Sequence, residues 1–252
     1  PAVRNRLASF LEKDADGNFS EENRELVRIA AKSLDKINER LAFYQFIERI
    51  FFGLSLGSVL LLAAIGLSIT FGVMGVINMA HGELLMLGAY TTYVIQQLMP
   101  NHIGLSIFIS IPAAFFVCAL VGVAIERGVI QFLKGRPLET LLATFGLSLI
   151  LQQSVRAIFS PLNRQVSSPE WMSGVWEINA GLALTYNRLY ILIFSLVVFF
   201  ILLLVMKKTA LGLYVRAVSQ NRDMAKAVGI RSEWVDAMTF GLGSGVAGVA
   251  GV

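Results

Sequence analysis

Charged residues are scarce in this chain, and the scarcity excludes an ordinary soluble enzyme. Only 15% of its 252 residues are charged, 56% are hydrophobic, and the mean hydropathy is +0.67. A soluble domain usually carries about a quarter charged residues. Of the 38 charged side chains, 18 lie within residues 4–49, which leaves 20 for the rest of the chain. That remainder has the composition of a protein that resides in a lipid bilayer.

Several chemical motifs are also absent. The single cysteine, Cys118, offers neither an internal disulfide nor a cysteine-rich zinc site. His81 and Glu83 have the spacing of a zinc deaminase motif but lack its cysteine pair. The sequence contains no P-loop for ATP, and we find no nucleophile and base at catalytic spacing. We therefore expect no catalytic residues, metal or cofactor in this chain, and its small net charge of +4 gives no reason to expect nucleic-acid binding.

Residues 1–49 are the only segment with the polar pattern of a soluble protein. After Ser20, a residue type that caps helix N-termini, apolar residues recur every three or four positions. We expect a helix here that continues into the first membrane segment. The preceding stretch from Asp14 to Glu22 is similar to a calcium loop, but Asn23 replaces its closing acidic ligand, so a polar turn is favoured.

Long runs without charge predict an all-α, multi-pass membrane protein with about six crossings. Residues 50–82 are uncharged, and this length of 33 residues exceeds the roughly 20 that one crossing needs. Glycines within the run predict a crossing over 50–71 and a broken helix near 72–82. We expect one membrane domain over 50–252, incomplete at its C-terminus. Its other crossings would lie in 84–98, 103–125, 140–155, 189–206 and 237–252.

Basic residues in the connections predict the orientation of the chain. The connections that contain residues 127–136 and 207–236 carry nine Lys and Arg residues, whereas the opposing connections carry three. Because cytoplasmic loops of membrane proteins are enriched in Lys and Arg, we expect the basic connections in the cytoplasm. Residues 1–49 would then be a helical extracytoplasmic segment, and the connection 160–186 an ordered outer loop that could form a hairpin.

Two ionisable residues lie between apolar spans in the segment 78–90. His81 and Glu83 would be costly at membrane depth, where such residues usually face a cavity or mark a pathway. A broken helix beside them would leave free backbone groups that also need a protein-lined site. Alternatively, Glu83 caps a helix at the cytoplasmic interface. We favour the pathway interpretation.

The basic connection 207–236 contains a short predicted helix. It would begin near Asn221 and end before Gly229, whose type commonly closes helices. With its small residues Ala225 and Ala227, this helix could dock into a groove on a soluble partner. A solvated helix at the membrane interface is the alternative.

Glycine recurs in the last expected crossing at Gly241, Gly245 and Gly248. Small residues at such spacing in a membrane helix are more typical of helix packing than of chemistry. We therefore expect this face to contact another helix.

Four groups of residues, taken together and in this order, point to one family. They are Gly57-Ser58 with Phe71-Gly72, Ile77-Asn-Met-Ala-His-Gly-Glu83, Gly135-Arg-Pro-Leu138 with Leu141-Leu-Ala-Thr-Phe-Gly146, and Arg216-Ala217 with Val228-Gly-Ile230. Over residues 50–252 the chain resembles the membrane permease subunit of a urea-type or branched-chain amino acid ABC importer. The segment 136–144, the segment 169–174 and the polar start make it most similar to the urea permease.

The resemblance implies a multi-pass protein of the bacterial inner membrane, surrounded by lipid, that works with partners. These would be ABC ATPase subunits that bind the ATP, a second related permease subunit and an external solute-binding protein. Closure of the ATPases would be transmitted through the cytoplasmic coupling loop 207–236. The coupling residues would be Arg216, Asn221, Ala225 and Gly229.

The substrate determines which groups the pathway needs. Urea is small and neutral, so hydrogen-bonding side chains would suffice, whereas a zwitterionic amino acid would need a carboxylate for its ammonium group. The sequence places urea first, and Glu83 keeps a branched-chain amino acid open as the alternative. A second alternative is an ion-coupled secondary carrier with a proton or sodium site at Glu83. The expected pathway residues are Asn78, His81, Glu83, Thr144, Ser148 and Gln152.

Overall fold

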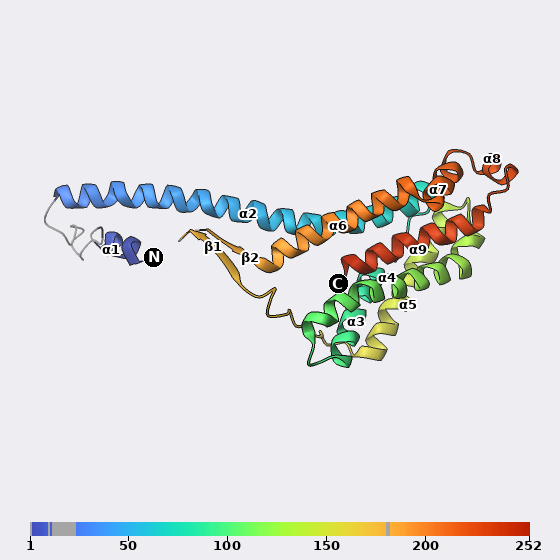
Figure 1. Ribbon diagram of the computed structural model, residues 1–252, viewed down its shortest axis with the longest axis horizontal. Helices are drawn as coiled ribbons and strands as arrows, with labels where there is room; N and C mark the ends of the chain where they lie inside the picture. The colour runs from blue at the N-terminus through green and yellow to red at the C-terminus, as the bar shows by residue number, and fades with distance from the viewer. Residues whose placement is uncertain (1, 10, 12–23, 180–181) are drawn as a thin grey trace.

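The computed structural model describes residues 2–9, 11, 24–179 and 182–252, and helices predominate among them (Figure 1). The expected helix cap Ser20 and the loop from Asp14 to Glu22 lie outside these residues. Within the described residues, four helices are long and apolar enough to cross a membrane. They are α2 (Arg24–Met74), α4 (Ile103–Gly128), α5 (Pro137–Phe159) and α6 (Tyr186–Lys208).

By length and composition, the described helices give four candidate crossings, so the expected count of about six is not confirmed. Helices α3 (His81–Leu98) and α9 (Ser232–Ala250) do form at the two other positions. Helix α3 carries His81, Glu83 and two glutamines, and α9 carries two acidic residues and many small ones, so neither is among the helices with a window apolar enough to cross a membrane.

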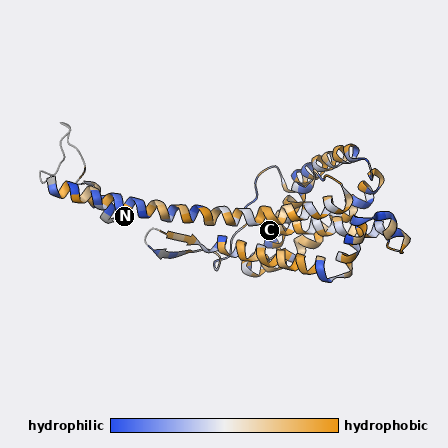
Figure 2. Cartoon of the chain, turned by 90° about the horizontal axis from the view of Figure 1, so that it is seen from above, coloured by the Kyte–Doolittle hydropathy of each residue, from blue (hydrophilic) through white to orange (hydrophobic). Residues whose placement is uncertain are grey.

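Helix α2 is one continuous element of 51 residues. With a rise of 1.5 Å per residue it is about 76 Å long, more than twice the hydrocarbon thickness of a bilayer. Its first half is rich in polar residues and its second half is apolar (Figure 2). The prediction that the polar helix continues into the first membrane segment is confirmed. The boundary expected between residues 49 and 50 falls inside this helix.

Helix α2 ends at Met74, and the chain is not helical again until α3 begins at His81. Gly75 has a φ of +67°, which a residue without a Cβ adopts at little cost. This break lies within the expected range 72–82. His81 Nε2 is 2.8 Å from the carbonyl oxygen of Ala63, which lies about 16 Å before the end of α2. The chain therefore returns along α2, and α3 begins beside the middle of the apolar half of that helix.

Helix α9 is the central helix of the bundle. It packs against α2, α3 and α4, and most of its residues are buried. Gly241, Gly245 and Gly248 all face α4. A methyl group added at Gly248 would lie 2.5 Å from the sulfur of Cys118, so the two helices pack too closely there for a larger residue.

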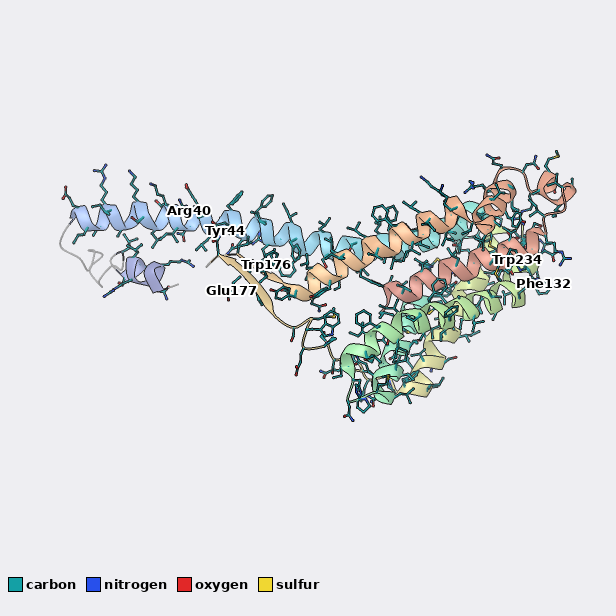
Figure 3. The ribbon with its side chains drawn as sticks, viewed as in Figure 1. Arg40, Tyr44, Phe132, Trp176, Glu177 and Trp234 are labelled. Atoms are coloured by element: carbon teal, nitrogen blue, oxygen red, sulfur yellow. The ribbon has the colours of Figure 1, made fainter. Side chains whose placement is uncertain are left out.

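The two ends of the molecule differ in structure. At one end, α1 (Ala2–Ser9) packs on α2, and a two-stranded antiparallel hairpin forms within the connection 160–186. Its strands are β1 (Val175–Asn179) and β2 (Leu182–Thr185). The hairpin lies beside α2, which β2 contacts (Figure 3). The opposite end carries both basic connections, with η1 (Ile130–Leu133), α7 (Ala210–Gln220) and α8 (Arg222–Ala227).

Candidate functional site

Polar side chains of α3 and α5 meet at the carboxylate of Glu83. The Ser148 hydroxyl donates to Glu83 Oε1 at 2.5 Å, and Gln152 Nε2 donates to the same oxygen at 2.6 Å. Ser148 and Gln152 are four residues apart and therefore lie on one face of α5. The structure thus brings together three of the expected pathway residues, although at least 65 positions separate Glu83 from the other two.

This cluster of Glu83, Ser148 and Gln152 lies level with the middle of the apolar half of α2. Glu83 is in the first turn of α3, which begins level with the middle of the α2 crossing, and Ser148 is near the middle of α5. Glu83 is half-buried, and among the described residues no Lys or Arg forms an ion pair with it. Its two donors are neutral, so an ionised carboxylate has the partial charge of the α3 N-terminus beside it but no full positive charge from a described Lys or Arg. A cationic group of a ligand would meet a complementary charge here.

Two other expected pathway residues hold the backbone of the break. The Thr144 hydroxyl oxygen accepts from the Met79 N–H at 3.2 Å, and its single hydrogen is shared between the carbonyls of Ile77 at 3.3 Å and Leu141 at 3.0 Å. Asn78 Oδ1 accepts from the Ala80 N–H at 3.0 Å. Backbone N–H and C=O groups outside a helix need such hydrogen-bond partners within a membrane, because no water is present there to bond to them. Thr144 and Asn78 therefore stabilise the shape of the segment between α2 and α3.

His81 is held apart from the cluster. Its Nε2 donates to the Ala63 carbonyl of α2, whereas Glu83 is bonded to α5. His81 is buried at the start of α3. Its contact fixes the depth at which α3 begins, and so it determines where Glu83 lies.

The expected coupling helix is present as α8, with the predicted caps. Asn221 Oδ1 accepts from the Met224 N–H at 3.0 Å. At the other end Gly229 has a φ of +89°, and its N–H donates to the Lys226 carbonyl at 3.0 Å. The Ile230 N–H donates to the Ala225 carbonyl at 3.0 Å. This pair of bonds is the Schellman motif, in which glycine is favoured.

The expected docking role of Ala225 needs a correction. Its side chain is buried in a cluster with Val215, Val218 and Val235 of the same chain, because α8 packs on α7 and α9. The exposed face of α8 instead carries Met224 and Val228, whose exposed fractions are 62% and 74%. Ala225 supports α8 from beneath and is not available to a partner.

The last expected coupling residue, Arg216, belongs to α7. Its guanidinium donates to the Met206 carbonyl in the last turn of α6, so it fastens α7 to the end of that crossing. This places Arg216 at the beginning of the connection 207–236, before α8.

Sequence reasoning missed a buried ionic network at the basic end, which we call the α8–α9 network. Asp236 and Glu126 are only 0% and 1% exposed. Lys134 Nζ is 2.8 Å from Asp236 Oδ2 and 3.1 Å from Glu126 Oε1. Arg222 donates to both Asp236 oxygens, at 2.7 and 3.0 Å. These bonds raise the pKa of the Arg222 guanidinium, and partial burial opposes the rise. The sequence offered one signal for this network: Glu126 and Asp236 each adjoin a long uncharged run, where a buried acid needs a partner.

Comparisons with known proteins agree on one family. Residues 49–252 match the family described as "Branched-chain amino acid transport system / permease component". LivH of Escherichia coli K12, a high-affinity branched-chain amino acid transport system permease protein, is 32% identical over 221 residues, 83% of this chain and 70% of LivH. BraD of Pseudomonas aeruginosa, with the same description, is 29% identical over 218 residues, again 83% and 70%. No solved structure matches the chain significantly.

Proposed function

Because the chain belongs to the family of branched-chain amino acid transport system permease components, we propose that it is the membrane subunit of an ABC importer for a branched-chain amino acid. As a permease component it is not an enzyme, and the ATPase is a separate subunit of such a transporter. The resemblance to an ABC importer permease therefore holds, whereas the comparisons favour the amino acid over urea, which the sequence placed first.

The observation that supports this substrate is the environment of Glu83. A branched-chain amino acid carries an ammonium group, and the carboxylate of Glu83 has only the neutral donors Ser148 and Gln152 as described partners. The N-terminus of α3 lies beside it at mid-depth, and the positive end of a helix dipole favours an anionic group such as the substrate carboxylate. Discontinuous helices use their ends in this way in membrane transporters. Neutral urea would need neither charge.

We also propose that α3 and α9 lie within the membrane, which gives six crossings. Helix α9 is enclosed by α2, α3 and α4, so its small and polar residues face protein and not lipid. The basic connections lie at one end and the hairpin at the other, in agreement with the alternation of crossings. With the basic end in the cytoplasm of a bacterium, α1 and the start of α2 lie outside.

The partners follow from this orientation. An ATPase subunit would contact the exposed face of α8 at Met224 and Val228, at the end of the molecule that also carries the exposed aromatic residues Phe132 and Trp234 (Figure 3). An external solute-binding protein would dock at the opposite end, near the hairpin. A second, related permease subunit would complete the membrane part of the importer.

The test is transport by the complete importer in proteoliposomes. We expect ATP-dependent uptake of labelled leucine that an excess of urea does not reduce. A matched preparation without ATP controls for leakage. Uptake of labelled urea without uptake of leucine would contradict the proposed substrate, and uptake that follows an ion gradient without ATP would contradict the ABC mechanism.

A further inference from the structure

The α8–α9 network lies outside the candidate pathway, but one of its members reaches the broken helix. We propose that Arg222 and Asp236 are positioning residues that transmit movement of α8 to the break after α2. The inference rests on the proposed function, because it assumes that α8 receives movement from an ATPase. It assigns a role to two residues that are neither in the pathway nor on the exposed face of α8.

Arg222 holds two other helices at once. Its Nη1 and Nη2 donate to the two oxygens of Asp236, in the first turns of α9. Its Nη2 also lies 3.4 Å from the carbonyl oxygen of Val73, in the last turn of α2. The last carbonyls of a helix have no partner within the helix, so a side-chain donor is well suited to them. A planar guanidinium can make these contacts together because its donors point in several fixed directions.

The other side of the network anchors Asp236. Lys134, from the connection after α4, contacts Asp236 and also the buried Glu126 at the end of α4. Arg127 also lies 3.8 Å from Glu126, so three cations surround the two buried carboxylates. The ends of α4, α8 and α9 are held together, and α8 cannot shift without displacing Arg222 from Asp236 or moving α9 with it.

The distance from Val73 to the candidate pathway is short along the chain. Gly75, with its φ of +67°, follows two residues later and gives the backbone a point at which it turns. Ile77 and Met79 then bond to Thr144 of α5, four residues before Ser148. The few non-helical residues after α2 therefore connect its end to α5, whose Ser148 and Gln152 hydrogen-bond to Glu83. A displacement of the end of α2 would reach α5 through them.

A purely structural role is the competing explanation, and a pair of variants separates the two. Arg222→Lys keeps a positive charge beside Asp236, but an ammonium group cannot reproduce the fork that reaches both Asp236 and Val73. The double variant Arg222→Gln with Asp236→Asn removes one charge of each sign and leaves Lys134 paired with Glu126. If the network only balances buried charge, both variants should behave as the wild type.

The deciding experiment measures movement and does not depend on the substrate. Cys118 is the only cysteine of the sequence and is buried, so cysteines introduced at Met79 and Leu149, which are both exposed, can carry spin labels. In the assembled transporter, we expect ATP to change the distance between these labels, and we expect Arg222→Lys and the double variant to abolish most of this change. Arg136→Lys, at an exposed ion pair with Glu139 on the same end, is the matched control and should behave as the wild type.

Uptake gives the second readout. We expect both network variants to bind the ATPase and hydrolyse ATP, but to import at least fivefold fewer leucine molecules per ATP than the wild type. A label distance that responds to ATP equally in the wild type and both variants would overturn the inference. Absence of leucine uptake by the wild type would instead contradict the proposed substrate, while the label measurement would still decide the role of Arg222 and Asp236.

Discussion

Gln152 donates a hydrogen bond of 2.6 Å to Glu83, although 69 positions separate the two residues in the sequence. The bond joins α5, a full crossing, to α3, a helix that begins at mid-depth. With the parallel bond from Ser148, it fixes one carboxylate oxygen and leaves the second without a described hydrogen bond. A substrate ammonium group would contact this second oxygen.

Replacement of Glu83 by Gln should weaken leucine recognition while it preserves the size of the side chain. A hydrogen bond to a charged group contributes about 1.5–3 kcal/mol, so we expect KM for leucine to rise by roughly tenfold or more. Initial uptake rates over a range of leucine concentrations measure this change. Ser148→Ala, which keeps the carboxylate, should have the smaller effect. An unchanged KM in Glu83→Gln would show that the carboxylate does not bind the ammonium group.

Thr144→Val should destabilise the segment between α2 and α3. Valine has nearly the shape of threonine but leaves the Met79 N–H without its acceptor and removes the hydroxyl hydrogen that the Ile77 and Leu141 carbonyls share. An unsatisfied buried group costs about 1–3 kcal/mol, so we expect a lower Tm of the purified protein in detergent and slower uptake. Thr144→Ser keeps the hydroxyl and is the control. Equal Tm values for the Val and Ser variants would contradict this account of the break.

Gly88→Ala should disturb the contact between α3 and α9. A methyl group at Gly88 would overlap the backbone carbonyl of Gly248, which cannot move aside as a flexible side chain could. Overpacking of this kind costs about 1–3 kcal/mol, and a lower Tm should follow. Gly57→Ala is the matched control on α2, because no atom of the described residues lies within 4 Å of the added methyl. If Gly57→Ala lowered Tm as much as Gly88→Ala, close packing would not be the cause.

Charges on the exposed face of α8 should weaken assembly without unfolding the permease. We expect Met224→Asp with Val228→Asp to leave Tm nearly unchanged, because both side chains are exposed, and to reduce the amount of ATPase that co-purifies. Ala225→Asp should instead lower Tm, because it buries a carboxylate among Val215, Val218 and Val235. Normal co-purification of the ATPase with the double variant would exclude this face as the docking surface.

The break and the caps could be predicted from sequence because local rules determine them. An uncharged run longer than one crossing, with Gly75 inside it, requires the chain to turn within the run. Asn221 and Gly229 have the residue types that the two ends of α8 require. Likewise, the four-residue spacing of Ser148 and Gln152 is sufficient to place them on one face of a helix.

The partners of these residues could not be predicted, because they depend on depth and on packing between distant segments. Glu83 reaches α5 only because the chain returns along α2 before α3 begins, and no periodicity in the sequence encodes that return. Asp236 pairs with Lys134 across about a hundred positions, whereas a count of loop charges treats each residue alone. The small size of Ala225 suggested a docking role. Its burial against α7 and α9 depends on how the helices pack, and the sequence alone does not reveal that packing.

The N-terminal half of α2 extends well beyond the part of the helix that is expected to cross the membrane. Its residues before the first expected membrane segment form a helical stretch of roughly 39 Å, so a tilt of only about 10° in the membrane would carry its tip through roughly 7 Å. Small rearrangements around Gly75 and Glu83 are hard to detect directly. If they tilt α2, the displacement of its N-terminal end is larger than the displacement near Gly75, because that end is farther away. A fluorophore attached near Arg28 would therefore report the tilt of α2 from outside the bilayer. Each repeat of its displacement in a single molecule would mark one transport cycle.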